Sequence, residues 1–224
     1  MDVRNKLYKN QGIHVITVLF TVEQGITKVL LVKRTNEPFA GYWVLTGGAL
    51  YNNEDLITGA LREIEEKSGI KNINITEFKI FGEVNRSPVM RMVAVCFFGV
   101  IDSKRVNILR KTRTTSNADW FALDKIPPLG FDHEEILAEG VKELQKKIVK
   151  SNILKVLYPD TVTIPELQKV YEAILNKKFD RRNFRKKILS LDILDDTSKH
   201  EQFDGNRPAK LYKFKKKIED KEVM

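Results

Sequence analysis

Two stretches near the start of the chain are almost continuously apolar and rich in β-branched residues. They cover residues 13–22 and 27–33, and Glu23-Gln24-Gly25 between them is typical of a hairpin turn, so two paired strands are expected. Apolar side chains recur at helical spacing over 54–68 and over about 132–149, which predicts a helix in each segment. The remaining strands of this part are expected at about 75–82, 90–101 and 118–123. The first two-thirds of the chain is therefore predicted to be mixed α and β.

The pattern changes near residues 150–160, where a basic stretch gives way to Tyr158-Pro159-Asp160. Thr163-Ile164-Pro165-Glu166 is a capping box with proline in the first turn, which predicts a helix from there to about residue 175. Asp180 is expected to cap a second helix over 181–191. The sequence therefore predicts one domain over residues 1–150 and a second over residues 151–224.

The second domain is expected to end in a hairpin. A short strand at 192–196 and another at 210–215 flank a polar turn that contains Gly205 and Pro208. Two helices followed by a hairpin within about 60 residues are the outline of a winged helix-turn-helix.

The charge of the chain is concentrated in that second domain. Residues 1–150 carry 22 Lys+Arg against 18 Asp+Glu, and residues 151–224 carry 17 against 12, so the net charges are +4 and +5 within a total of +9. Positive charge at this density favours a polyanionic partner, although a solvated basic face would have the same composition.

Three features of the sequence bear on where in the cell the protein is expected to be. No apolar stretch is long enough to span a membrane, and the first residues lack the apolar core of a signal peptide. The single cysteine, Cys96, lies in an apolar run and is expected to be a buried thiol. These features predict a soluble, cytoplasmic protein with no membrane partner.

Residues 48–70 closely resemble the Nudix box, G-x5-E-x7-R-E-U-x-E-E-x-G-U, in which U is apolar. The matching positions are Gly48, Glu54, Arg62, Glu63, Ile64, Glu66, Gly69 and Ile70. Several fixed residues at fixed spacing make this a specific signal. The resemblance covers about residues 10–150 and implies an α/β/α sandwich around a mixed sheet.

One position of the box departs from the family pattern. In the family, the glutamates that correspond to Glu63 and to residue 67 are the main metal ligands, but residue 67 here is a lysine. An ammonium repels a divalent cation and has no lone pair to donate. Lys67 also follows Glu63 by four residues, an arrangement that allows an ion pair. Glu54, Arg62, Glu63, Glu66 and Lys67 are therefore expected to be vestigial, with no catalytic residue, no metal and no required cofactor.

The first domain also contains candidate contacts for a bound effector. Arg86 and Arg91 flank Pro88, and arginine forks suit phosphate oxygens, although two surface arginines beside a turn would give the same pattern. His133 lies at the start of the predicted helix 132–149, where a purely structural role is the alternative. The expected effector-binding residues are Trp43, Gly48, Glu63, Arg86, Arg91 and His133.

A run of basic residues marks the second helix of the C-terminal domain. Phe184, Ile188 and Leu191 are its expected buried face, which leaves the basic side chains near its start free to contact DNA. The hairpin adds a basic tip suited to phosphate or minor-groove contact. The expected DNA-binding residues are Lys177, Lys178, Arg181, Arg182, Asn183, Arg185, Lys186, Arg207 and Lys210.

A degraded Nudix box followed by a basic winged helix is similar to the Nudix-related transcriptional regulators. Further likeness lies in FDHEEIL at 131–137, in the segment 166–189 and in GNRPAKLYKF at 205–214. The fold class implied is α+β, with a Nudix-like sandwich followed by a small winged helix. The resemblance implies a homodimeric repressor of NAD or sugar metabolism genes that binds double-stranded operator DNA and senses ADP-ribose or a sugar.

Two alternatives stay open on the sequence alone. The first is a Mg²⁺-dependent pyrophosphohydrolase that acts on ADP-ribose or a similar nucleoside diphosphate derivative, with Glu63 and Glu66 holding the metal and Glu54 assisting. The second is an adaptor that binds neither ligand nor DNA. The sequence does not decide whether the effector releases or promotes DNA binding.

Overall fold

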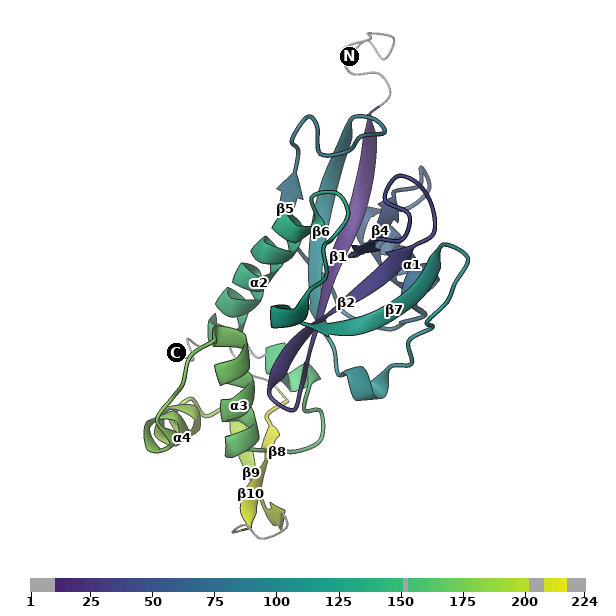
Figure 1. The fold of residues 1–224 in the computed structure, drawn as a ribbon. Helices are drawn as coiled ribbons and strands as arrows, with labels where there is room; N and C mark the ends of the chain where they lie inside the picture. Colours follow the sequence, from purple (N-terminus) through teal and green to yellow (C-terminus); the bar gives the residue numbers. More distant parts are fainter. Residues whose placement is uncertain (1–10, 151–152, 202–207, 217–224) are drawn as a thin grey trace. The chain divides into compact units, whose positions relative to one another are not determined.

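The computed structural model describes residues 11–150, 153–201 and 208–216 (Figure 1). Its contacts divide the chain into two compact units. The first comprises residues up to 20, 28–99 and 104–141, and the second comprises 21–27, 100–103 and the chain from 142 onward. The tip of the first hairpin and the end of the long helix thus belong to the same unit as the C-terminal domain.

A seven-stranded sheet forms the centre of the first unit. Its main path has the order β3-β2-β1-β6-β5, with β4 paired to β1 and β7 paired to β2. The pairs β1–β4, β2–β3, β2–β7 and β5–β6 are antiparallel. The strands are β1 (Gly12–Glu23), β2 (Ile26–Arg34), β3 (Trp43–Val44), β4 (Thr46–Ala49), β5 (Thr76–Phe81), β6 (Met92–Val100) and β7 (Thr115–Ala122).

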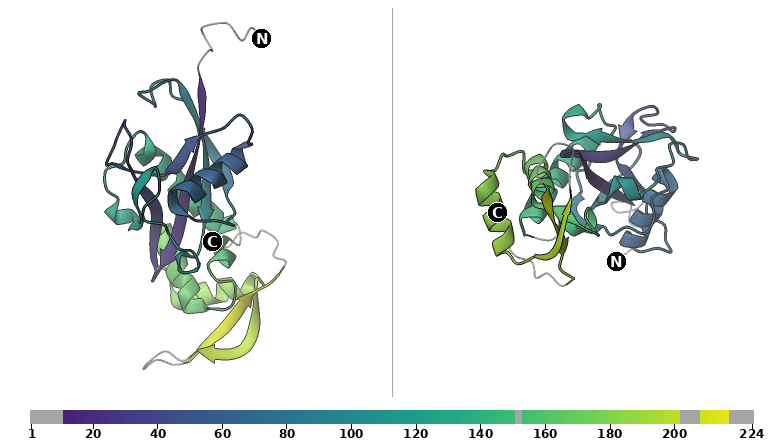
Figure 2. Two further views of the ribbon diagram at one scale, coloured as in Figure 1. Left: turned by 90° about the vertical axis from the view of Figure 1, so that its right-hand side faces the viewer. Right: turned by 90° about the horizontal axis from the view of Figure 1, so that it is seen from below.

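Two helices cover opposite faces of this sheet (Figures 1 and 2). Ala60 of α1 (Leu56–Ser68) packs in a buried cluster with Val15 of β1. Gly140 of α2 (His133–Lys150) lies against Val18, where an added Cβ would come within 3.1 Å of the valine side chain. Because side chains alternate between the faces of a strand, positions 15 and 18 point to opposite sides. Short 3₁₀ turns occur at η1 (Ser103–Arg105), η2 (Leu123–Lys125) and η3 (Ile153–Val156).

The C-terminal domain consists of two helices and a three-stranded sheet of order β8-β10-β9. The aromatic rings of Tyr171 and Phe184 join the two helices, with centroids 5.5 Å apart. Strands β9 and β10 form an antiparallel ribbon, drawn in yellow-green and yellow in Figure 2. The elements are β8 (Val162–Thr163), α3 (Ile164–Leu175), α4 (Arg181–Ser190), β9 (Leu194–Glu201) and β10 (Ala209–Phe214). This is a winged helix, as the sequence predicted.

Thr163 and Asp180 cap the starts of α3 and α4, as the sequence predicted. Thr163 Oγ1 accepts a hydrogen bond from the Glu166 N–H, and a Glu166 carboxylate oxygen accepts one from the Thr163 N–H at 2.8 Å. Asp180 accepts a hydrogen bond from the Asn183 N–H at 2.9 Å. Both local signals therefore fixed where these helices begin.

Several boundaries differ from the sequence expectation. Strand β9 runs to Glu201 rather than ending at 196, because its second half is polar and exposed and so has no apolar alternation to reveal it. The short strands β3, β4 and β8 were not predicted. The division at 150/151 stays a prediction, since the contacts separate the two units at 141/142, within a helix that continues to Lys150.

Cys96 is buried, and burial raises the pKa of its thiol to about 12. Among the described residues, none of the helices has the length and apolar character needed to cross a membrane.

Candidate functional site

The Gly47-Gly48 pair lets strand β4 lie close to both the sheet and helix α1. A Cβ on Gly47 would collide with the Val15 carbonyl and with Ile16, and one on Gly48 would collide with the Glu63 carboxylate. Only glycine therefore allows the Glu63 side chain to lie directly over this strand. Helix α1 is held beside β4 by its caps, with Asp55 accepting from the Thr58 N–H at its start and Gly69 left-handed at its end.

Arg62 connects the acidic residues of the box. Its guanidinium contacts Glu54 at 2.6 Å and Glu63 at 2.7 Å, and it donates to the Ala49 carbonyl at 2.9 Å. The hydrogen bonds from Arg62 lower the pKa of Glu54 to about 2. The guanidinium also lies 3.8 Å from the centre of the Tyr51 ring. The arginine thus fixes the loop before α1 and orients Glu63.

The ammonium of Lys67 lies between the Glu63 carboxylate and the Gly47 carbonyl oxygen. Its Nζ lies 3.1 Å from Glu63 Oε2 and donates to the Gly47 carbonyl oxygen, and only 14% of the side chain is exposed. Burial lowers the pKa of Lys67, while the Glu63 carboxylate opposes that shift. The ion pair expected from the spacing of residues 63 and 67 is therefore present.

A magnesium ion does not fit the residues at this position. Mg²⁺ takes oxygen ligands in an octahedral arrangement, and the carboxylate and carbonyl oxygens that could supply them are already bound to an ammonium. Glu66 is half exposed and lies 3.6 Å from Arg62. Glu65 points away and pairs with Lys71 at 2.6 Å. Among the residues that the structure describes, no cluster of three or more histidine, cysteine or acidic side chains could hold a metal.

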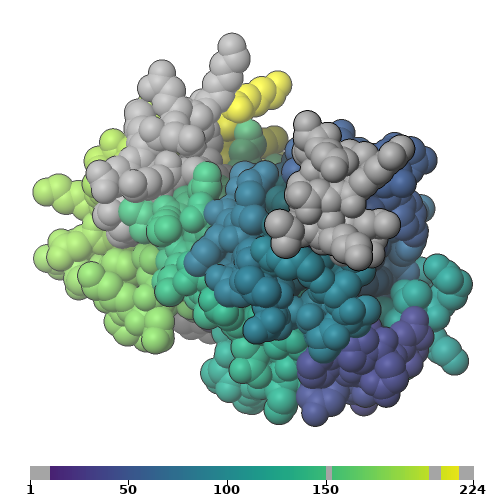
Figure 3. Space-filling model, turned by 90° about the horizontal axis from the view of Figure 1, so that it is seen from above, coloured from purple at the N-terminus to yellow at the C-terminus, as the bar shows by residue number. Residues whose placement is uncertain are grey.

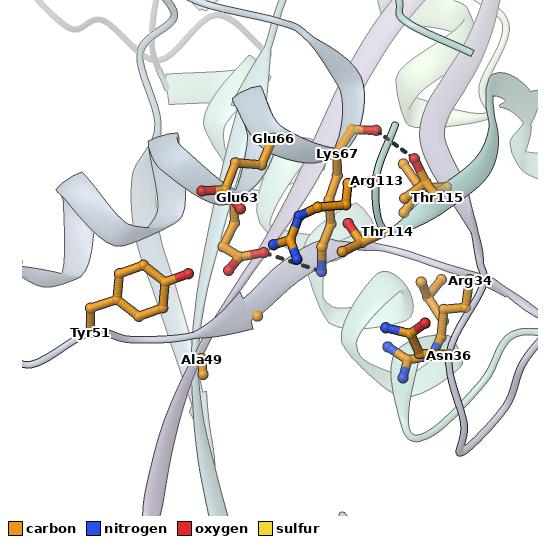
Figure 4. Close-up of a pocket in the computed structure, with 13 residues that line it drawn as sticks. Arg34, Asn36, Ala49, Tyr51, Glu63, Glu66, Lys67, Arg113, Thr114 and Thr115 are labelled. Carbon is orange, nitrogen blue, oxygen red and sulfur yellow. Dashed lines mark hydrogen bonds and ion pairs between the residues drawn. The ribbon is translucent and has the colours of Figure 1, made fainter. Parts of the chain in front are cut away.

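Glu63, Glu66 and Lys67 form one wall of a polar pocket of about 210 Å³. Figure 4 shows it between α1, which contributes Glu63, Glu66 and Lys67, and the segment that leads into β7. The further lining residues are Val32, Arg34, Asn36, Val44, Gly48, Ala49, Tyr51, Arg113, Thr114 and Thr115. Three cationic side chains thus face two carboxylates, one of which is already paired with Lys67.

Burial lowers the pKa values of two histidines in the first unit. His133 is buried, its Nδ1 accepts a hydrogen bond from the Leu45 N–H at 2.9 Å, and its pKa is lowered to about 3 by burial and then by Arg86 and Lys67. Burial and the same two cations lower the pKa of His14 to about 4.

The structure brings together only part of the predicted effector site. Gly48 and Glu63 line the pocket. Arg86 is buried in a two-point ion pair with Asp132, both contacts being 2.8 Å, and Arg91 donates to the carbonyls of Gly82, Glu83 and Met92. These arginines and His133 fix loops and the start of α2, so their role as effector contacts stays a prediction.

Trp43 is one of several partly buried aromatic residues of the first unit. Its ring packs against Phe121, with centroids 4.6 Å apart. Nearby in the chain, Phe39 packs on Phe131 at 4.5 Å, and Arg34 lies 5.0 Å from the Phe131 ring. A Cβ added at Gly130 would lie 3.1 Å from the Phe39 Cβ. Figure 3 shows a purple, early segment of the chain next to a green segment on one face of the molecule.

The sequence did not identify the cations that complete the pocket. Arg34 is the last residue of β2, and Arg113 precedes β7, so both are far from the box along the chain. Only the pairing of β2 with β7 brings them to one place, and no local motif indicates it.

The second candidate site is the exposed surface of α4. Phe184 and Ile188 are buried beneath it, and Leu191 follows the helix end in the same core. The exposed residues of the helix include Arg181, Arg182, Asn183, Arg185, Lys186 and Lys187. A helix with a basic surface at its N-terminal end, in a winged helix, can enter the major groove of DNA.

Some of the other predicted DNA-binding side chains are exposed, and others already have a partner within the chain. Lys177 is exposed, Lys178 pairs with Glu172 at 3.0 Å, and Lys210 pairs with Asp196. Arg185 donates to the Tyr212 hydroxyl at 3.3 Å. Exposed ion pairs contribute little to stability, so a phosphate can replace such a partner. Arg207 lies outside the described residues.

The fold and both sites define a Nudix domain joined to a DNA-binding winged helix. Residues 12–140 match the NUDIX domain model, and residues 154–214 match the model of the NrtR DNA-binding winged helix domain. A relative described as the ADPR responsive transcriptional repressor NtrR of Acinetobacter baylyi is 30% identical over 200 residues, which cover 88% of this chain and 79% of the relative. The chain belongs to the NrtR family of Nudix-related transcriptional regulators.

Two solved structures are similar to this chain, one over nearly its whole length and one over its Nudix part. The complex of Shewanella oneidensis NrtR with a 27mer DNA superposes with a TM-score of 0.78 at 31% identity, covering 91% of this chain and 93% of that one. The NUDIX domain of the same protein in complex with ADP ribose gives a TM-score of 0.56 at 30% identity, covering 62% of this chain and 92% of that one.

Proposed function

We propose that this protein is a transcriptional repressor whose winged helix binds operator DNA and whose Nudix domain binds ADP-ribose, with loss of DNA binding as the response. The observation that carries the proposal is the position of Lys67. Its ammonium closes the metal position of a Nudix pocket on a chain that also presents a basic recognition helix. A fold that keeps its pocket but lacks its metal is suited to sensing a ligand rather than cleaving it.

The DNA-binding part rests on α4. Its exposed cations lie on a helix whose opposite face is anchored by Phe184 and Ile188, so the helix is a rigid base for groove contacts. The similar protein from Shewanella oneidensis was solved in complex with DNA. We propose a homodimer that places two copies of α4 on a near-palindromic operator, in genes of NAD metabolism.

The effector part rests on the polar pocket. A nucleoside diphosphate derivative carries two negative charges that suit Arg34, Lys67 and Arg113, and the similar NUDIX domain was solved with ADP ribose. Sugars without phosphate would not use this charge, so ADP-ribose is the preferred candidate.

Fluorescence anisotropy tests this function directly. Labelled DNA from the promoter upstream of the gene is titrated with the full chain at fixed salt, with and without ADP-ribose, and the nucleotide is then analysed by chromatography. We expect a discrete complex that ADP-ribose weakens without being consumed. A complex that ignores ADP-ribose would redirect the effector assignment to sugars. No specific complex together with Mg²⁺-dependent cleavage of ADP-ribose would establish the hydrolase alternative.

A further inference from the structure

The environment of Lys67 places a fixed positive charge at the floor of the pocket. The side chain lines the cavity, and its Nζ is held by Glu63 Oε2 at 3.1 Å and by the Gly47 carbonyl. Figure 4 shows the ammonium end of Lys67 directed from α1 into the space below Arg113. The ammonium is therefore not a mobile surface charge, because two anchors define its position.

An ammonium has three hydrogen-bond donors. Glu63 and Gly47 account for two of those of Lys67 within the described part of the chain, so one remains for a ligand in the pocket. A lysine that only neutralised Glu63 would not need to face the cavity. Arg62, which already contacts Glu63 at 2.7 Å, supplies that neutralisation from the other side.

In a metal-dependent pocket a divalent cation would attract diphosphate oxygens to this place. Here the oxygen donors at the position hold the Lys67 ammonium, and a magnesium ion does not fit beside it. Charge-assisted hydrogen bonds to phosphate are about twice as strong as neutral ones, so a buried ammonium can attract the same oxygens.

Resting on the proposed effector function, we propose that Lys67 is a ligand-binding residue whose ammonium contacts a diphosphate oxygen of the effector. The pocket then binds a nucleoside diphosphate derivative without any divalent cation. Arg34 and Arg113, which also line the pocket, assist, and Glu63 acts as a positioning residue that holds the ammonium in place.

Isothermal titration calorimetry of the full chain with ADP-ribose tests this assignment. The wild-type protein is measured in excess EDTA and again in excess Mg²⁺, and we expect the same dissociation constant in both. Lys67→Met keeps the length of the side chain but removes the charge, so the dissociation constant should rise about 10–100-fold. Lys71→Met is the matched control, because Lys71 forms the same kind of ion pair with Glu65 on the exposed surface beyond α1, and its affinity should equal that of the wild type.

A double variant separates direct contact from neutralisation of Glu63. If Lys67 contacts the ligand, Lys67→Met combined with Glu63→Gln stays as weak as the single variant. If Lys67 only cancels the Glu63 charge, the double variant recovers wild-type affinity, and the proposal is overturned. A cooperative melting transition and retained DNA binding show that each variant is folded, whatever the shift in melting temperature that loss of the buried ion pair causes.

Two further outcomes would also overturn it. Wild-type binding that requires Mg²⁺ would mean that a metal displaces the lysine, and an unaffected Lys67→Met variant would mean that the ammonium does not contact the ligand. Both leave the proposed effector function standing. A wild-type protein that binds operator DNA but no ADP-ribose would instead refute the effector assignment together with this inference.

Discussion

Lys67 stands where the Nudix pattern has a glutamate, so an ammonium replaces a carboxylate at this position. Its ammonium binds Glu63 and the Gly47 carbonyl, where a carboxylate would instead have added a metal ligand. Because the backbone around the pocket is set by Gly47, Gly48 and Arg62, the substitution changes the chemistry without changing the fold. The sequence identified this residue, and the structure adds its two anchors.

Restoring the carboxylate should restore metal binding. A Lys67→Glu variant places an acidic side chain next to Glu63 and Glu66, which gives the carboxylate ligands that Mg²⁺ prefers. We expect Mg²⁺ to raise the melting temperature of this variant and not that of the wild type, and we expect Mg²⁺-dependent cleavage of ADP-ribose to increase. Lys71→Glu adds the same charge outside the pocket and should do neither. Equal cleavage by the wild-type protein would show that Lys67 does not block the metal.

His133 should make the stability of the fold depend on pH. Its pKa is lowered from 6.5 to about 3 in the folded protein, mainly by burial. Above about pH 6.5 the residue is neutral in both states, so its contribution to stability is fully present there; the contribution is lost as the pH falls from 6.5 toward the folded pKa, since only the unfolded chain gains the proton. By pH 5 this should cost about 2 kcal/mol.

Urea unfolding at about pH 7.5 and pH 5 measures this effect. His133→Gln should be less stable than the wild type at the higher pH, because the Leu45 N–H has an imperfect acceptor, but its stability should fall less on acidification. The remaining decrease includes that of His14, whose pKa is also lowered. Parallel pH profiles for the two proteins would show that His133 is not a buried neutral residue.

At the scale of helices and strands, local signals were reliable where a capping residue or a turn was present. The hairpin at Gln24 and Gly25, both with positive φ, and the starts of α3 and α4 were predicted correctly for this reason. Strand β9 was underestimated because an exposed ribbon needs no apolar alternation.

The capping box of α3 offers a test of how much one local signal contributes. Thr163→Ala removes the oxygen that accepts from the Glu166 N–H, in a residue that is 1% exposed. We expect it to lower the free energy of unfolding of the winged helix by about 1–2 kcal/mol. Thr161→Ala, two residues earlier and exposed, should change it by less than about 0.5 kcal/mol. Equal effects in urea unfolding would mean that the cap does not stabilise the helix.

The role of α4 can be measured through the salt dependence of DNA binding. If Arg182 contacts a phosphate, Arg182→Ala should weaken operator binding and reduce the slope of log affinity against log salt by about 1. Lys146→Ala removes another exposed cation, from α2, and should leave both quantities unchanged. A reduced affinity with an unchanged slope would assign Arg182 to base contact, whereas no change would place the DNA surface elsewhere.

For the whole molecule, the sequence predicted the two domain types and their order, but not the full set of pocket residues. Gly48 and Glu63 belong to the Nudix box, a continuous motif that the resemblance identified, and both line the pocket; Lys67 was assigned to the box but not to the effector-binding residues. Arg34 and Arg113 reach the pocket only through the pairing of β2 with β7, a long-range contact that leaves no local pattern. Arg86 suggested a phosphate contact by its chemistry; two of its donors are bound to Asp132, and its contact with an effector stays a prediction.

In the proposed mechanism, two sites on one chain share a free energy of coupling. If ADP-ribose weakens operator binding, operator DNA must weaken ADP-ribose binding by the same factor, because both describe one thermodynamic cycle. A coupling of about 1–3 kcal/mol corresponds to a factor of about 5–150.

The most direct test is therefore calorimetric titration of ADP-ribose into the free protein and into the protein saturated with its operator, at the same salt concentration. We expect a dissociation constant that is about 5–150-fold higher in the presence of the operator, matched by the loss of operator affinity when ADP-ribose is saturating. Identical ADP-ribose binding with and without operator would contradict the claim that this Nudix domain controls the winged helix.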